Sequence, residues 1–226
     1  MNVKILLEYL SALEQNNNRD WYHANKQELQ TANRAFEEML RLFIAEIRKT
    51  DDAIPPLEPK ELTFKLVRDT RFSHDKSPYN PSFRAHIAAK GKLPIPVGYY
   101  ILIKPGNRSF LGGGLFADLF KDATELVRSR IAARGDEWQK LISDPAFAET
   151  FTIGGTALKN VPRGYDPAHP QAEYLKYKSW YLEYPLSDAQ LLDADFISSA
   201  TEIFRKMQPF NSFLNNALID FQMPAR

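Results

Sequence analysis

With 226 residues, 44% of them hydrophobic and 25% charged, the chain has the composition of an ordinary globular protein with a sizeable core. It contains no cysteine, which excludes disulfide bonds, thiol nucleophiles and thiolate metal sites. A net charge of +1 gives the molecule as a whole little attraction for polyanions. No apolar run approaches the roughly 18 residues of a membrane span, and Glu8 interrupts the only N-terminal apolar stretch. We therefore expect a soluble, cytoplasmic protein without membrane contact.

The charge is unevenly distributed along the chain. Residues 1–59 carry a net charge of −3, residues 60–113 of +7, and residues 114–226 of −3. The positive centre either forms a local anion-attracting surface or neutralises its acidic flanks in three dimensions.

The first fifty residues have the spacing of amphipathic helices. Leu6, Leu10 and Leu13 lie on one helical face, and the asparagines at 16–18 end this helix. Asn18 can cap the next helix, whose apolar stripe runs to Ile47. The proline-rich segment 54–59 cannot continue a helix, so it predicts an extended linker.

The middle of the chain changes to a period of two. Alternating apolar side chains predict strands at about 62–66, 83–87, 97–103 and 109–111, with a later strand at about 174–183. This alternation is typical of antiparallel strands with one covered face.

The last hundred residues return to helix. Ser187 and Gln190 form a capping-box pair at the start of a C-terminal helix, and Pro209 ends or kinks that helix before a final one from Phe210. Other predicted elements are helices at about 119–134 and 138–142 and a loop-rich region at about 154–172.

These elements predict an α+β fold, formed as a single domain over residues 1–226. A central antiparallel sheet, built from about residues 61–113 and the later strand, is packed by the N-terminal and C-terminal helices.

Three sequence blocks resemble the family known as domain of unknown function 2461, found mainly in bacteria. They are Asn16–Tyr22 with Asn25 and Lys26, Arg68–Tyr79, and Leu158–Tyr165 with His169 and Pro170. His74 and Asn80 stand where the family leads us to expect lysines. The resemblance implies a single-domain fold in an intracellular setting, and it implies no known activity.

The block from Arg68 to Asn80 holds the densest set of polar side chains. Arg68, Arg71 and Lys76 can converge on one anionic group, with Asp75 orienting them and Tyr79 as a neutral donor. Alternatively, the arginines pair with the aspartates and only tie the loop down. Three bases against two acids leave a surplus of positive charge.

The loop at 158–170 is stiffened by three prolines. Either it folds over the central block, where Lys159 and Arg163 close the same site, or it is a long surface connection packed by Tyr165. The four histidines show no metal-ligand spacing, so we expect no metal and no cofactor. The glycines at 112–114 either make a tight turn or offer backbone N–H groups to an anion.

Two functions remain open from the residues. The first is binding of a small anionic ligand, phosphorylated or carboxylated, with or without turnover, at Arg68, Arg71, Asp75, Lys76, Tyr79, Lys159 and Arg163. The alternative is a non-enzymatic interaction module whose basic strand face (Lys65, Arg84, His86) meets an acidic protein or nucleic acid. The near-zero net charge and the lack of an RNA-module signature argue against nucleic acid. Ligand identity, catalysis and oligomeric state are left undetermined by the sequence.

Overall fold

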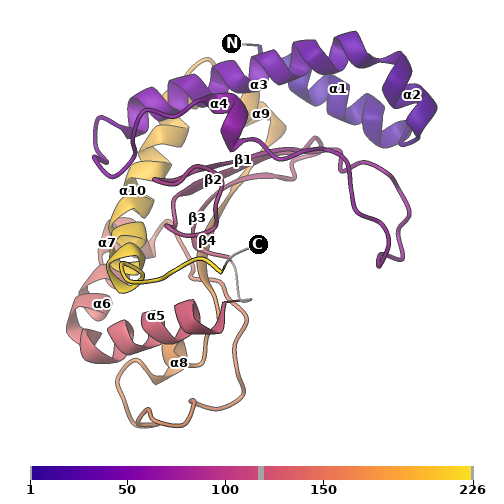
Figure 1. Ribbon diagram of the computed structural model, residues 1–226. Helices are drawn as coiled ribbons and strands as arrows, with labels where there is room; N and C mark the ends of the chain where they lie inside the picture. The colour runs from indigo at the N-terminus through magenta and orange to yellow at the C-terminus, as the bar shows by residue number, and fades with distance from the viewer. Residues whose placement is uncertain (1, 117–119, 225–226) are drawn as a thin grey trace.

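The computed structural model describes residues 2–116 and 120–224, and Figure 1 shows their path. The helices are α1 (Val3–Gln15), α2 (Arg19–Ala24), α3 (Lys26–Ile47), α4 (Pro59–Leu62), α5 (Lys121–Ala133), α6 (Gly135–Ile142), α7 (Pro145–Ala148), α8 (Ala172–Leu175), α9 (Asp188–Leu192) and α10 (Phe196–Ala217). The strands are β1 (Phe83–Ile87), β2 (Tyr99–Ile103), β3 (Ser109–Leu115) and β4 (Trp180–Leu186). None of the described helices is both long and apolar enough to cross a bilayer.

The four strands form one antiparallel sheet in the order β1-β2-β3-β4. Helices from both ends of the chain flank the sheet, and the connection from β3 to β4 carries α5 to α8 (Figure 1). The predicted α+β class, with a central antiparallel sheet between N-terminal and C-terminal helices, is therefore confirmed.

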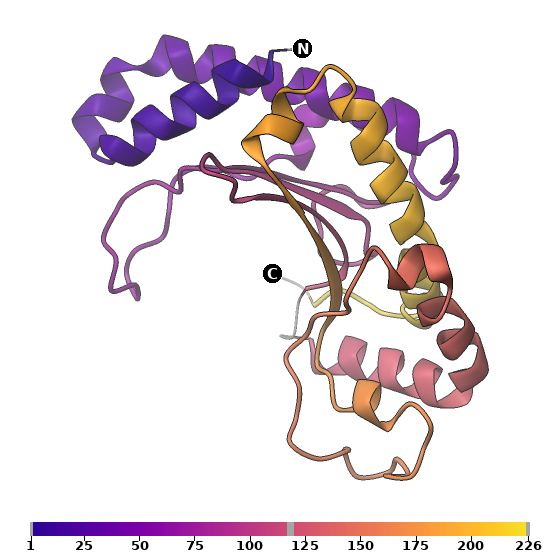
Figure 2. The ribbon, with the colours of Figure 1, turned by 180° about the vertical axis from the view of Figure 1, so that it is seen from behind.

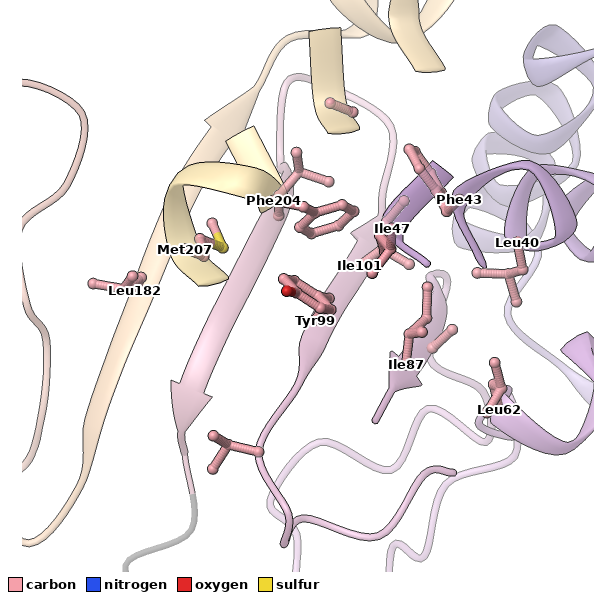
Figure 3. Close-up of a cluster of buried hydrophobic side chains, with 14 of the residues drawn as sticks. Leu40, Phe43, Ile47, Leu62, Ile87, Tyr99, Ile101, Leu182, Phe204 and Met207 are labelled. Atoms are coloured by element: carbon pink, nitrogen blue, oxygen red, sulfur yellow. The ribbon is translucent and has the colours of Figure 1, made fainter. Parts of the chain in front are cut away.

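The core lies between the sheet and the helices α3 and α10. Figure 3 shows Phe43 of α3 and Phe204 of α10 directed at the same region of the sheet as Tyr99 and Ile101 of β2. All four side chains are buried, and the rings of Tyr99 and Phe204 meet edge-on with centroids 5.2 Å apart. Because side chains alternate along a strand, the residues between these buried ones face the opposite side, which we call the open face.

The capping signals in the sequence are confirmed. The Asn18 side chain accepts a hydrogen bond from the Trp21 backbone N–H at 2.9 Å, at the start of α2. Ser187 and Gln190 form the predicted capping box at the start of α9. Leu191 of this short helix is buried, so the cap fixes where the chain turns from β4 back onto the core.

Pro209 does not end the C-terminal helix, because α10 continues through it to Ala217. The predicted division at Pro209 is wrong, and the helical region after Ser187 is divided instead at residues 193–195, between α9 and α10. Phe204 and Met207 before the proline and Phe210 and Leu214 after it are all buried on one stripe. Their packing against the sheet offsets the hydrogen bond that proline removes.

Two asparagines fasten α10 to the sheet. The Asn211 side chain accepts from the Gly114 N–H at 2.7 Å and donates to the Gly98 carbonyl at 3.1 Å. Asn215, one turn later, makes the same pair of bonds to the backbone of Val97, at 2.8 and 3.0 Å. Without these bonds, the backbone N–H and carbonyl groups just before β2 and near the end of β3 would be buried without hydrogen-bond partners.

The segment predicted as a strand at 62–66 is not one. Leu62 ends α4, and the chain beyond it makes only isolated bridges, Thr63 with Ala85 and Val67 with Tyr79. The later strand also begins further on than predicted, at Trp180, because residues 172–175 form α8. On the other side of the sheet, Gly154 forms an isolated bridge with Tyr181 of β4, as Thr63 does with Ala85 of β1.

Smaller boundaries also differ from the prediction. The glycines at 112–114 lie inside β3 rather than in a turn. The described part of the helix predicted from residue 119 begins at Lys121, and residue 119 itself lies outside the described residues.

Candidate functional site

The loop after α4 is held in shape by Arg68. Its guanidinium donates to the Asp75 carboxylate, to the Ser77 carbonyl at 3.3 Å and to the Ser73 hydroxyl at 3.3 Å. Asp75 also accepts from the hydroxyl and the backbone N–H of Ser77, at 2.6 and 2.9 Å. These Ser77 bonds, with the Arg68 charge, hold the pKa of Asp75 well below its usual range. Asp75 therefore stays ionised and fixes the direction of the Arg68 fork.

The tip of this loop is closed by a second pair. The Arg71 guanidinium donates to both carboxylate oxygens of Asp69, with its shortest bond at 2.6 Å, and the Arg71 side chain is 77% exposed. Lys76 donates to the Thr70 carbonyl at 3.0 Å. The Arg71–Asp69 pair is one that the alternative of arginine–aspartate pairing predicted, and Lys76, which that alternative did not include, is also bonded within the loop.

A polar cavity of about 400 Å³ opens at the base of the loop, and we call it the Arg68 cavity. Its lining includes three of the predicted residues, Arg68, Asp75 and Tyr79. The other lining residues are Glu14, Asn17, Ser77, Asn80, Pro81 and Lys104.

The N-terminal helices supply one wall of the Arg68 cavity. The Asn17 side chain donates to the Tyr79 carbonyl at 2.9 Å and accepts from the Tyr79 N–H at 3.1 Å. The Tyr79 ring is buried and stacks on Tyr22 with centroids 3.9 Å apart. Segments 62 residues apart in the chain are therefore joined rigidly at this point.

The charges around the Arg68 cavity do not cancel completely. Arg68 neutralises Asp75, and Arg108 neutralises Glu14 through two bonds of 2.6 and 2.9 Å. The Arg108 bonds lower the pKa of Glu14, so both carboxylates are ionised and paired. Lys104 forms no hydrogen bond through its ammonium group and no salt bridge with any residue in the described ranges. It is the surplus cation of the cavity.

Asn80 also lines the Arg68 cavity at a position where the family leads us to expect lysine. Its carbonyl oxygen accepts from the Ser82 hydroxyl at 2.9 Å, which leaves its amide N–H groups as neutral donors. The cavity is thus less positive at this point than one with a lysine would be.

The loop containing Lys159 and Arg163 does not approach the Arg68 cavity. Figures 1 and 2 show the 158–170 loop and the 68–78 loop at different ends of the molecule in both views. Lys159 and Arg163 are exposed there, and the Tyr165 hydroxyl donates to Glu125 of α5 at 2.6 Å. The structure corresponds to the alternative of a surface connection packed by Tyr165.

The proposed basic strand face is less basic than its sequence indicates. The Arg84 guanidinium lies over the Phe64 ring, 5.6 Å from its centroid, and donates to the Lys65 carbonyl at 3.1 Å. His86 is only 7% exposed, and burial lowers its pKa to about 4, so it is neutral at pH 7. Two charged side chains remain, which weakens the interaction-module alternative.

Sequence reasoning missed Glu14, Asn17 and Lys104 as cavity residues. Asn17 lies within a block that resembles the family, and that was its only signal. Glu14 and Lys104 carried none, because helix α1 and the end of β2 bring them together only in the fold. Among the described residues, no group of three or more His, Asp or Glu side chains could hold a metal ion.

The fold and this cavity define an α+β protein with a polar surface cavity whose two carboxylates are in salt bridges and whose lysine, among the described residues, is in none. The model of the family described as "Conserved hypothetical protein (DUF2461)" matches residues 5–213, nearly the whole chain. The chain belongs to this family. No curated protein and no solved structure matches it.

Proposed function

We propose that the protein binds a small anionic ligand, phosphorylated or carboxylated, in the Arg68 cavity. The observation that supports this most directly is that Lys104, which forms no salt bridge with any described residue, lines the same cavity as the ordered guanidinium of Arg68. An anion in this cavity would meet the ammonium charge of Lys104 and the positive guanidinium of Arg68, and both groups are common at phosphate and carboxylate sites.

The remaining lining groups would give the anion its orientation. The Asn80 amide can donate to it, while Asp75 keeps Arg68 in one rotamer rather than contacting the ligand. Glu14, already bound to Arg108, contributes little repulsion because that pair is nearly neutral. Arg71 and Lys76 would act indirectly, by holding the shape of the loop.

The test is the effect of inorganic phosphate on thermal unfolding, with chloride at the same ionic strength as the reference. A ligand at ten times its Kd adds about 1.4 kcal/mol to the free energy of unfolding. In Lys104→Gln, the melting temperature without phosphate should be close to the parent value, because Lys104 has no salt bridge to lose. The phosphate-dependent rise should be largely abolished.

Lys159→Gln is the matched control, because it removes one exposed lysine far from the cavity. It should leave the phosphate effect intact. Binding at the Arg68 cavity is disproved if the parent shows no phosphate-specific stabilisation, or if both variants lose it equally.

A further inference from the structure

The open face of the sheet carries a continuous cluster of aromatic rings. Phe116 stacks on Tyr181 with centroids 4.6 Å apart and planes at 15°, and it also meets Tyr100 at 5.7 Å. Tyr100 contacts Phe110 at 5.8 Å and Phe64 at 6.2 Å. These rings come from three strands and from the segments that follow α4 and β3, so the fold assembles them.

The rings are not sealed into the core. Phe116 is 39% exposed, and the other four are half-buried. All of them except Tyr181 line a second cavity of about 390 Å³, which we call the aromatic cavity. Its lining includes Phe64, Tyr100, Phe110 and Phe116 together with Lys92 and Glu183. This volume lies within the usual range for small-molecule sites, which are mostly apolar with a few polar groups.

Strand register sets the polar groups of the aromatic cavity in a row. Tyr100 pairs with Gly112, and Gly112 pairs with Glu183, so Tyr100 and Glu183 flank a glycine on the same face. A Cβ atom at Gly112 would lie 3.0 Å from the Phe116 ring. The glycine therefore leaves room for the Phe116 ring to approach β3 closely.

The two sides of the aromatic cavity have opposite charge. Glu183 is exposed on β4, and it forms no salt bridge or hydrogen bond through its carboxylate with the residues described. Lys92 lies on the β1 side, where its ammonium group donates only a long bond of 3.4 Å to the Thr63 carbonyl. Arg84 is on the same side, above the Phe64 ring. A ligand that fits this surface has a flat ring, an N–H donor edge and an anionic end.

We infer that the aromatic cavity binds a free nucleoside monophosphate whose base bears an exocyclic amino group. The base would stack on the Tyr100 ring, a contact that every nucleobase can make, and would meet the tilted Phe116 ring at its edge. Its amino group would donate to Glu183, as a carboxylate accepts from the cytosine amino group in base recognition. The phosphate would lie towards Lys92 and Arg84.

The charge pattern favours a mononucleotide over its alternatives. A purely cationic ring compound would meet Lys92 and Arg84, and a purely apolar one would leave the Glu183 carboxylate unused. A nucleic-acid strand crossing the face would bring further phosphates past Glu183, where they would be repelled. Adjacent strands lie about 4.8 Å apart, so β1 to β4 spans about 14 Å, on the scale of one nucleotide.

The test is calorimetric titration of the full chain with cytidine monophosphate, uridine monophosphate and ribose 5-phosphate. We expect cytidine monophosphate to bind at least tenfold more tightly than the other two. Glu183→Gln should weaken its binding about tenfold and leave uridine monophosphate nearly unchanged, while Tyr100→Leu should weaken both nucleotides about tenfold. Glu149→Gln, which changes an exposed glutamate outside the cavity, is the matched control and should bind like the parent.

Several results would overturn this inference. They are the absence of cytidine monophosphate binding to the parent, ribose 5-phosphate binding as tightly as the nucleotide, or equal losses in Glu183→Gln and Glu149→Gln. A short oligocytidylate that binds far more tightly than the monomer would assign the face to a nucleic-acid strand instead. Lys104→Gln separates this inference from the Arg68 cavity, because it should not change nucleotide binding. A loss of that binding in Lys104→Gln would place the nucleotide in the Arg68 cavity.

Discussion

Replacing Asn211 with leucine should destabilise the protein strongly. Asn211 is 3% exposed, and its amide group satisfies both the Gly114 N–H and the Gly98 carbonyl. Leucine has a similar size but no polar atoms, so it would leave two buried backbone groups without partners and would exclude water from them.

The magnitude follows from these two groups. Each unsatisfied buried donor or acceptor costs about 1–3 kcal/mol, which gives about 4 kcal/mol for the pair. Leucine is a better helix former than asparagine by about 0.5 kcal/mol, so the expected net loss for Asn211→Leu is about 3.5 kcal/mol. For a chain of this length, that loss corresponds to a fall in melting temperature of about 7–14 °C.

Urea unfolding followed by circular dichroism measures this loss as a lower midpoint at an unchanged slope. Asn216→Leu is the matched control, because Asn216 lies on the same helix and is exposed. Its free energy of unfolding should change by no more than about 0.5 kcal/mol. A loss below about 1 kcal/mol in Asn211→Leu would refute the reasoning, since the two backbone groups would then have found other partners.

Three further perturbations test other parts of the fold. Burial holds the pKa of His86 at about 4, against about 6.5 in the unfolded chain, so the unfolded chain takes up the proton first. The free energy of unfolding should therefore fall by about 3 kcal/mol as the pH drops from 6.5 to 4, and His86→Gln should lack this contribution to the fall. If the free energy of unfolding depended on pH in the same way in the parent and in His86→Gln, His86 would not be the group responsible. In Gly114→Ala, at φ +89°, the new Cβ would lie 2.4 Å from a backbone oxygen of β4, so calorimetry should show a loss of at least about 2 kcal/mol. Gly164→Ala is the control, because its φ is similar but no atom lies within 4 Å of its new Cβ. If Gly164→Ala lost as much stability as Gly114→Ala, the close contact at Gly114 would not be the cause of the loss. Tyr99→Phe removes a 2.6 Å hydrogen bond to the buried Asp51 and should cost about 2 kcal/mol in urea unfolding at pH 7; a cost below about 0.5 kcal/mol would contradict the importance of that bond.

The features predicted correctly from the sequence depend on neighbours in the chain. Asn18 caps a helix three residues away, and Ser187 and Gln190 form a local capping box. The errors arose where tertiary packing decides. Pro209 is tolerated inside α10 because the sheet holds both halves of the helix, and the apolar alternation from Leu62 meets β1 only through an isolated bridge. The single-domain organisation stays a prediction.

For the candidate site, the sequence indicated a surplus of positive charge but not its position. Arg68 and Asp75 were predicted to lie together, and the structure joins them. Lys76, predicted with Arg68 and Arg71 to hold the anion, instead donates to a carbonyl within its own loop. The lysine that lines the Arg68 cavity is Lys104, which follows β2 and comes to this cavity only through the fold. Ligand binding by these residues stays a prediction.

The isolated bridges beside the sheet have a consequence for solubility. An unprotected outer strand presents a row of unpaired backbone groups that can recruit a strand from another molecule, the first step of edge-to-edge aggregation. Thr63 bridges to β1 and Gly154 bridges to β4, so each outer strand is shielded over part of its length by a neighbouring segment of the same chain. Neither segment is long enough to add a strand to the sheet. Each nevertheless covers some of the backbone N–H and carbonyl groups to which an incoming strand would have to bond. Loosening either segment should therefore promote self-association before it unfolds the core.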